Sequence, residues 1–287
     1  MSDRALQGTG IAINDGPWQT ARTAVLRRAQ WLVARAVAVA VLLAAVSPVA
    51  HAAVMTRFDP TVHGFHFINQ FTAQRAVTLR FPKPVGKRTI RIGHGPYGLC
   101  GGMSYSALDY FLAGKPIPSD TTAPNSGPLY GYIYARQLNT FTLGTLAKFA
   151  LYPFRRDEGL LSTSLGAFSG QIRHRIDGGN PVPLGLIKTK GFSHVLTGNH
   201  QVLATGYSTR QITITTRKCF AGICTKPKRR RVTEPVIAIY DPNFPNHVKW
   251  IQTYHHVETN DEAGTSPVSG HSRVRGYFTT PYTFHRP

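Results

Sequence analysis

The pattern of apolar and polar positions changes near residue 180. Before that point, four segments carry apolar residues at helical spacing, and glycine- and proline-containing stop signals follow two of them, at 114–116 and 177–181. We therefore expect helices at 100–114, 127–141, 143–152 and 163–177.

After residue 180 the chain consists of short apolar runs separated by turn residues, which is typical of β-strands. Thr213 and Thr215 alternate with Ile212 and Ile214, as in a strand with one exposed face. The four clearest strands are expected at 182–187, 201–207, 211–216 and 236–240. We also expect a strand within 247–254, a polar, glycine-rich loop at 258–272, and extended and turn structure at 57–90.

Helices followed by strands indicate an α+β fold. The length beyond residue 52 suits one domain with a sizeable core. We therefore expect residues 53–287 to form a single domain, with its core at about 64–254 and a hairpin insertion at about 208–233.

The first 52 residues do not read as part of this domain. Arginines lead into an apolar run at 36–46, and Ala50 and Ala52 supply the small residues of a cleavage site. The run is short for a membrane span, and Arg35 interrupts its front end. The pattern predicts a secretion signal, with an uncleaved N-terminal anchor as the alternative, and hence a secreted, periplasmic or cell-envelope protein.

The chain is strongly basic, with a formal net charge of +20 at pH 7, of which residues 53–287 keep about +17. Such a charge favours anionic partners: bacterial surface polymers, anionic lipid or nucleic acid. The densest run, residues 226–231, falls in the expected insertion, where such runs are most often solvated tips. No aromatic residue interleaves with this run, so nucleic acid is not an expected partner.

Cys100 is the first candidate for chemistry, because it lies in the glycine-rich segment 95–103 just before an expected helix. Glycines let the backbone bend tightly and approach another group. Helix N-terminal N–H groups favour the thiolate, which is the nucleophilic form. A lone cysteine is more often a small buried apolar residue. The flanking glycines, which have no evident packing purpose in a helix, and the expected export favour the nucleophile.

His200 and Asp241 lie downstream at the edges of apolar, strand-like runs. A cysteine followed by a histidine and then by an acid or amide is the chain order of a papain-like triad. A helix start and two strand ends would then meet at one cleft.

Three segments together resemble those of papain-like cysteine hydrolases: 98–103 (GLCGGM), 199–207 (NHQVLATGY) and 240–243 (YDPN). They are similar to an uncharacterised bacterial group, and the His-then-Asp-Pro ending also resembles double-glycine leader peptidases. The resemblance covers about residues 64–254. It implies a papain-like fold, in which an N-terminal helical part with the cysteine at a helix start packs on a C-terminal antiparallel sheet.

By this resemblance Cys100 is the nucleophile, His200 is the general base, and Asp241 orients the imidazole. Asn243 competes for the third role, because papain-like enzymes often use an amide there. Asp241 is favoured because it directly follows a β run, and Asn243 is expected to stabilise the turn after Pro242.

An oxyanion hole needs two donors near the attacked carbonyl. The backbone N–H of Cys100 is the natural first donor. Papain-like enzymes place a glutamine six positions before the cysteine, but this chain has His94 there. His94, Asn69 and Gln70 stay open as alternatives for the second donor.

Cys219 and Cys224 are the other two of the three cysteines, and a glycine lies between them. In an oxidising compartment they are expected to form a small disulfide loop, with two reduced thiols as the alternative. No Cys/His cluster has zinc-ligand spacing, so neither a metal nor a cofactor is expected.

The leading hypothesis is an exported cysteine hydrolase that cleaves a peptide or cell-wall amide bond through a thioester intermediate. Its substrate would be a peptide or an anionic cell-envelope polymer, and an uncleaved N-terminal segment would be its one link to a membrane. Two alternatives stay open: a transglutaminase-like acyltransferase using the same intermediate, and a catalytically idle papain-like module that binds a surface.

Overall fold

The structure is a computed structural model that describes residues 52–72, 77–80, 89–92, 96–191, 198–216, 219–220, 223–262 and 272–287. Residues 1–51 of the expected leader lie outside these ranges, so the leader and the single domain after it stay predictions. Within the described ranges, every helix is too short or too polar to span a bilayer.

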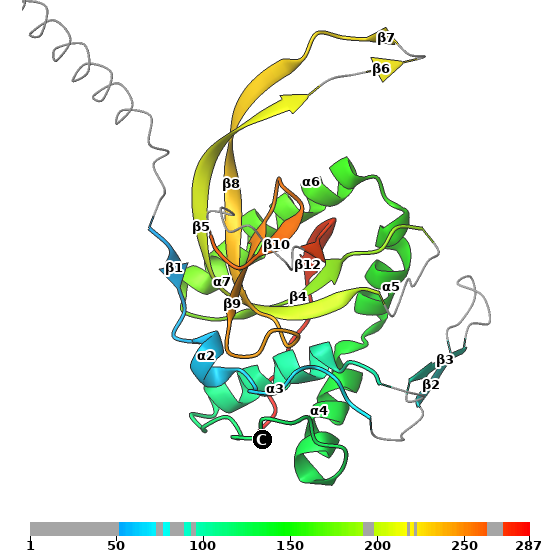
Figure 1. The fold of residues 1–287 in the computed structure, drawn as a ribbon, viewed down its shortest axis with the longest axis vertical. Coiled ribbons are helices and arrows are strands. Elements are labelled where there is room, and N and C mark those ends of the chain that lie inside the picture. The colour runs from blue at the N-terminus through cyan, green and yellow to red at the C-terminus, as the bar shows by residue number, and fades with distance from the viewer. Residues whose placement is uncertain are drawn as a thin grey trace, which may run out of the picture. The chain divides into compact units, whose positions relative to one another are not determined.

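The helices precede most of the main sheet along the chain (Figure 1). The helical elements are α2 (Pro60–His63), α3 (Cys100–Leu112), α4 (Gly127–Thr140), α5 (Leu143–Leu151), the 3-10 turn η1 (Tyr152–Phe154), α6 (Asp157–Ala167), the π-helical turn η2 (Phe168–Ile172) and α7 (Arg173–Asp177). α4 carries a proline in its first turn, and α5 begins after Thr142, whose hydroxyl accepts from the Thr145 N–H. α3, α4 and α5 thus form where the apolar spacing predicted them.

The fourth expected helix, 163–177, was predicted to start too late in the chain. Helical structure begins earlier, at Asp157, and continues through α6, η2 and α7 to Asp177. Asp157 and Glu158 lie in the first turn of α6, where negative charge is stabilised by the helix dipole. This start signal is electrostatic and carries no apolar periodicity.

One large antiparallel sheet forms the second half of the structure. Its strand order is β11-β10-β9-β8-β5-β4-β12, and β1 pairs with Gly206 and Tyr207 in the middle of β5. The strands are β1 (Val54–Met55), β4 (Val182–Ile187), β5 (His200–Thr216), β8 (Lys228–Tyr240), β9 (Val248–Gln252), β10 (Val257–Thr259), β11 (Ser272–Arg273) and β12 (Gly276–Thr279). Two separate ribbons pair β2 (Val77–Arg80) with β3 (Thr89–Ile92) and β6 (Cys219–Phe220) with β7 (Ile223–Cys224).

The sheet curls into a half-barrel. Its two outermost strands, β11 and β12, are consecutive in the chain and are joined by Val274 and Arg275 alone. So short a link brings the two edges of the sheet together, since an extended residue spans only about 3.3 Å. Lys188, after β4, accordingly lies 3.8 Å from Glu258 on β10, although three strands separate β4 from β10 in the order.

Three expectations about strands were wrong in detail. The runs 201–207 and 211–216 form one continuous strand, β5, and β8 begins at Lys228 instead of 236. The expected loop 258–272 contains most of β10 and the first residue of β11. The strand β12 was not predicted. These strands are short, or are polar and exposed, so neither an apolar run nor a clear alternation marks them.

The inner strands are buried on both faces, which explains how the helical part attaches to the sheet. Val202 and Ala204 pack in one apolar cluster with η2, α7 and the concave face of the sheet. Leu203, between them, belongs to a second cluster with Met103 of α3 and the aromatic side chains of the N-terminal segment. Alternate side chains of β5 therefore face the inside of the half-barrel and α3.

β5 and β8 run together beyond the body of the sheet as a two-stranded ribbon, residues 209–216 and 228–235, here called the arm (Figure 1). The register is continuous from Thr209–Pro235 to Thr216–Lys228. The side chains of residues 225–231 are all exposed. The arm therefore lacks the two-sided packing of the inner sheet, and pairing along its length is its main support.

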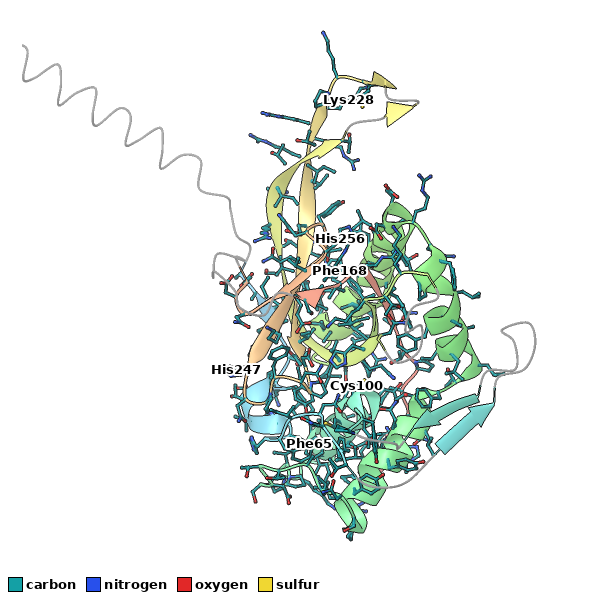
Figure 2. The ribbon with its side chains drawn as sticks, turned by 45° about the vertical axis from the view of Figure 1, so that its right-hand side comes forward. Phe65, Cys100, Phe168, Lys228, His247 and His256 are labelled. Atoms are coloured by element: carbon teal, nitrogen blue, oxygen red, sulfur yellow. The ribbon has the colours of Figure 1, made fainter. Side chains whose placement is uncertain are left out.

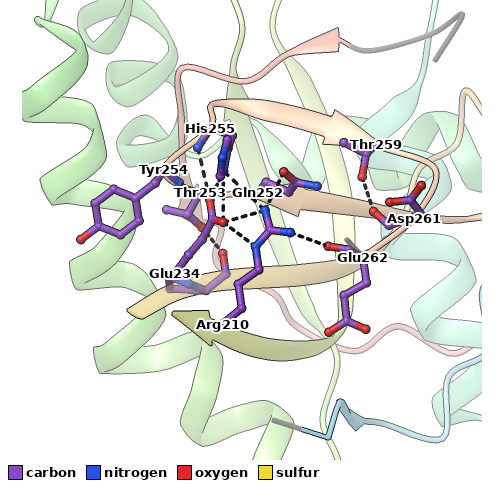
Figure 3. A network of polar contacts seen from close by, with 10 residues as sticks. Arg210, Glu234, Gln252, Thr253, Tyr254, His255, Thr259, Asp261 and Glu262 are labelled. Carbon is purple, nitrogen blue, oxygen red and sulfur yellow. Dashed lines mark hydrogen bonds and ion pairs between the residues drawn. The ribbon is translucent and has the colours of Figure 1, made fainter. Parts of the chain in front are cut away.

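A buried polar network holds the base of the arm (Figure 3). Arg210 Nε donates to Glu234 Oε2 at 2.8 Å, and its Nη2 donates to Gln252 Oε1 at 2.8 Å. Glu234 also accepts from His255 Nδ1 at 2.9 Å and from the Tyr254 N–H at 2.8 Å. Burial opposes the charge of Glu234, but His255 and Arg210 outweigh it and lower the pKa of Glu234. The network ties β5, β8 and the turn after β9 together where the ribbon leaves the body.

Cys219 and Cys224 are direct partners in the β6–β7 pair. Opposite positions in an antiparallel pair bring Cα atoms to about 4.5–5.5 Å, within the range that a disulfide needs. We expect denatured, unreduced protein to titrate one thiol, that of Cys100, instead of three, and its intact mass to rise by two hydrogens on reduction. Three free thiols would show that the pair is reduced.

Candidate active site

Cys100 is the first residue of α3 and lies where that helix meets the sheet (Figure 2). It is partly exposed and is a free thiol. The backbone N–H of Gln201 donates to its sulfur, and Ser104 Oγ, one turn later, donates to the Gln201 carbonyl at 3.4 Å. The start of α3 is therefore fixed against the beginning of β5.

The described glycines around Cys100, which are Gly98, Gly101 and Gly102, permit close packing, and none of these three has a positive φ. A Cβ on Gly102 would lie 2.2 Å from the Ile133 carbonyl oxygen of α4, and one on Gly101 would lie 2.6 Å from Gln201 Nε2. The expected close approach is present at Gly101 and Gly102, whereas Gly95, at the start of the segment expected to bend, lies outside the described residues. The expectation that these glycines have no packing purpose was wrong, because they let α3 lie against α4 and β5.

Strand register places His200 and Asp241 together. Leu203 pairs with Tyr240, so continuing the register by one step sets Asp241 opposite Val202, on the same face as His200. His200 Nε2 lies 2.6 Å from Asp241 Oδ1. The imidazole is 6 % exposed and the carboxylate is fully buried.

The other side of the imidazole faces the cysteine. The side chains of His200 and Cys100 hydrogen-bond each other, and Nδ1 is the ring nitrogen left for this contact because Asp241 holds Nε2. The structure thus brings the three expected triad residues into one hydrogen-bonded chain.

The charges around Cys100 and His200 favour an ion pair between these two side chains. Burial alone raises the pKa of the Cys100 thiol, but the charge and hydrogen bond of His200 and the Gln201 N–H outweigh burial and lower it. Burial opposes a charged imidazole, but Asp241 and Cys100 outweigh it and raise the pKa of His200 to about 10. Between these two pKa values the favoured state is thiolate with imidazolium.

Asn243 lies farther from the imidazole than Asp241 does. Its Nδ2 is 3.3 Å from His200 Nε2, and that nitrogen already donates to the carboxylate. The turn after Pro242 is stabilised by Asp241, whose Oδ1 accepts from the Asn243 N–H at 2.8 Å. The expectation that Asn243 stabilises this turn therefore holds for its backbone N–H.

Asn69 links the helix start to this turn. Its Oδ1 accepts from the Leu99 N–H at 2.6 Å, which makes Nδ2 the donor to Asn243 Oδ1 at 3.0 Å. The Asn69 N–H also donates to the Pro242 carbonyl at 3.0 Å. Both polar atoms of the Asn69 amide are already hydrogen-bonded. Asn69 therefore fits the role of a structural link between α3 and this turn better than that of an oxyanion donor.

The first turn of α3 offers backbone donors for an oxyanion. The Gly102 N–H donates to Gln137 Oε1 at 2.9 Å, whereas no described residue accepts from the N–H of Cys100 or Gly101. Gln70 is exposed, and His94 lies outside the described residues. The identity of the second oxyanion donor stays a prediction. The Gly101 N–H is the candidate nearest to Cys100 in the sequence.

No family model, curated protein or solved structure matches this chain. The resemblance to papain-like hydrolases therefore stays an expectation carried by three short segments, and the case for function rests on the geometry of the site.

The sequence did not point to two residues that the structure places around the triad. Gln137 on α4 binds the first turn of α3, and Glu258 hydrogen-bonds Asp241 from β10. Glu258 was assigned to the expected loop 258–272. One signal was available: acidic residues are scarce in this basic chain, with 13 Asp and Glu in all, and Glu258 stands between Val257 and Thr259.

A pocket of about 500 Å³ opens beside the far end of α3, lined by residues that include His63, Phe111 and Lys115. None of its lining residues belongs to the triad. Cys100 begins the same helix, so about three helical turns separate it from this pocket.

Proposed function

We propose that this protein is an exported, papain-like cysteine hydrolase that cleaves an amide bond. One observation carries the proposal: a nearly buried imidazole, His200, is hydrogen-bonded to a cysteine on one side and to a buried carboxylate on the other. A nucleophile, a base and an orienting group in hydrogen-bond contact are the elements of nucleophilic amide hydrolysis.

In this mechanism the Cys100 thiolate attacks the amide carbonyl and a C–S bond forms. The backbone N–H groups of Cys100 and Gly101 would face the oxyanion. The His200 imidazolium then protonates the leaving nitrogen, the C–N bond breaks and an amine departs, which leaves a thioester. His200, now neutral, takes a proton from water, and the resulting hydroxide displaces the thiolate to give the acid.

The Cys100→Ser variant tests this chemistry. We expect wild-type protein to release new amino groups from a mixed-sequence peptide library or from isolated cell-wall cross-links, and Cys100→Ser to lose that activity by more than about 10³-fold. Adding a primary amine separates the alternatives, because an acyltransferase would form a new amide in place of the acid. A wild-type protein as inert as Cys100→Ser on every substrate favours the surface-binding module.

The arm gives a candidate for recruiting an anionic substrate. Lys228 and Arg230 project from one face of the ribbon and Arg229 and Arg231 from the other, because alternate residues of a strand point to opposite sides. All four are exposed, and Figure 2 shows Lys228 well out along the arm from Cys100. Their charge can act on binding without touching the triad.

Neutralising these four residues to glutamine is expected to weaken binding to an anionic cell-envelope polymer and to flatten its salt dependence. Turnover of a small soluble substrate should change by less than about twofold, since the triad is untouched. The two double variants, Lys228→Gln with Arg230→Gln and Arg229→Gln with Arg231→Gln, are matched controls that remove equal charge from opposite faces. Unchanged binding in the fourfold variant would mean that the run is only a solvated tip.

A further inference from the structure

Two buried carboxyl groups meet behind the imidazole, and only one of them has a place in the triad. Asp241 and Glu258 are both fully buried. Glu258 pairs with Ile251, which pairs with Ile237, so Glu258 projects from the same face of the curled sheet as Asp241. The two side chains hydrogen-bond each other.

Asp241 uses its two oxygens differently. Oδ1 is 2.6 Å from His200 Nε2 and accepts from the Asn243 N–H at 2.8 Å. Oδ2 is buried and has no donor among the described residues when both carboxyl groups are treated as ionised. A buried acceptor without a donor costs about 1–3 kcal/mol, so this oxygen calls for a proton from a neighbour.

Glu258 shows the complementary arrangement. Its Oε2 accepts from Ser272 Oγ at 2.9 Å and lies 3.8 Å from Lys188 Nζ. Its Oε1 is buried and likewise has no donor among the described residues. One proton between Oε1 and Asp241 Oδ2 satisfies both of these oxygens.

We propose that Glu258 is a positioning residue that keeps its carboxyl proton and donates it to Asp241 Oδ2, which holds Oδ1 in line with His200. The triad would then have a fourth member on β10, two strands away from β8. The case for the proton rests on the contact between the two buried carboxyl groups and on their unpartnered oxygens, and only its effect on Cys100 rests on the proposed function.

The charges around Glu258 agree with a retained proton. Burial and the neighbouring Asp241 carboxylate raise the pKa of Glu258 to about 7, although Lys188 and His200 act in the opposite direction. Lys249 is a buried cation on the same face, and its ammonium group donates a hydrogen bond to Asn260 Oδ1. Above about pH 7 the pair would carry two adjacent negative charges, which repel.

Infrared difference spectroscopy on the full chain tests the proton directly. We expect wild type to show a protonated-carboxyl band at about pH 6 that disappears by about pH 9. The Glu258→Gln variant should lack this band, and Glu158→Gln, a control at an exposed position of α6, should keep it. Absence of any band that Glu258→Gln removes would overturn the proposal.

The rate of Cys100 alkylation tests positioning. Glutamine keeps an N–H donor for Asp241 and an acceptor for Ser272, so Glu258→Gln should alkylate within about twofold of wild type at about pH 6. Glu258→Ala has no donor and should be about tenfold slower or more. Equal loss in both variants would overturn the positioning role.

A second variant covers the case in which Glu258→Gln fails to fold. Asp241→Asn removes the neighbouring negative charge but leaves Glu258 buried, so the pKa of Glu258 should fall and its protonated band should disappear at a lower pH than in wild type. A protonated band with the same pH dependence in Asp241→Asn as in wild type would show that Asp241 does not hold the proton in place, and would overturn the proposal.

Discussion

Iodoacetamide is expected to label Cys100 readily at about pH 6, and a His200→Gln variant should be labelled more than about 100-fold more slowly. In the wild type the imidazolium and the Gln201 N–H together hold the thiolate. Without the imidazole, burial and Asp241 both raise the pKa of Cys100. Even an ordinary thiol of pKa ~8.5 is under about 1 % ionised at pH 6.

Glutamine is the better replacement, because Asp241 is fully buried. His200→Ala would leave this carboxylate without its cation, at a cost of about 3–5 kcal/mol, whereas glutamine can still offer it an N–H donor. His174→Gln, at an exposed position of α7, is the matched control and should label like wild type. Circular dichroism checks that all three proteins are folded.

The labelling rate is measured against pH by mass spectrometry of the Cys100 peptide. The pKa of Cys100 is lowered and that of His200 is raised to about 10. The ion pair should therefore persist between these two values. It is lost as the pH falls through the lowered thiol pKa or rises through the raised imidazole pKa. Superimposable wild-type and His200→Gln curves, both rising only near the free-thiol pKa, would separate Cys100 from His200 and favour the binding module.

The meeting of Cys100, His200 and Asp241 could be predicted because each stands at the boundary of a local pattern. Cys100 begins a helix with clear apolar spacing, and His200 and Asp241 flank β runs whose side chains alternate. Helix starts and strand ends lie at the edges of packed layers, so such residues gather there. The α+β arrangement followed from the same patterns.

The rest of the site depends on the curl of the sheet, which no local pattern encodes. Glu258 reaches Asp241 across one intervening strand, and it approaches Lys188 across three. Both contacts exist because Val274 and Arg275 join the edge strands β11 and β12. Strands of two to four residues carry too few positions to show alternation, so the closure was missed together with Glu258.

The glycines beside Cys100 were correctly singled out, but for an incomplete reason. The segment around them suggested a tight bend, whereas the structure uses the absence of side chains to bring backbones together. Gly102 lies against the Ile133 carbonyl, and its N–H donates to Gln137 on the same helix, α4. The position of the Cys100 helix start therefore depends on the α3–α4 contact.

Replacing Gly102 with alanine is expected to destabilise the protein by about 3 kcal/mol or more, at the upper end of overpacking costs. The new Cβ would lie 2.2 Å from a backbone oxygen of α4, so the two helices must separate and Cys100 must shift relative to His200. Gly131→Ala is the matched control, because a Cβ at this α4 position meets nothing within 4 Å; it should be neutral or stabilise by up to about 1 kcal/mol. Urea unfolding followed by circular dichroism measures both, and Cys100 alkylation should slow in Gly102→Ala alone. A Gly102→Ala midpoint equal to that of Gly131→Ala would show that the α3–α4 contact is not close enough to set the position of Cys100.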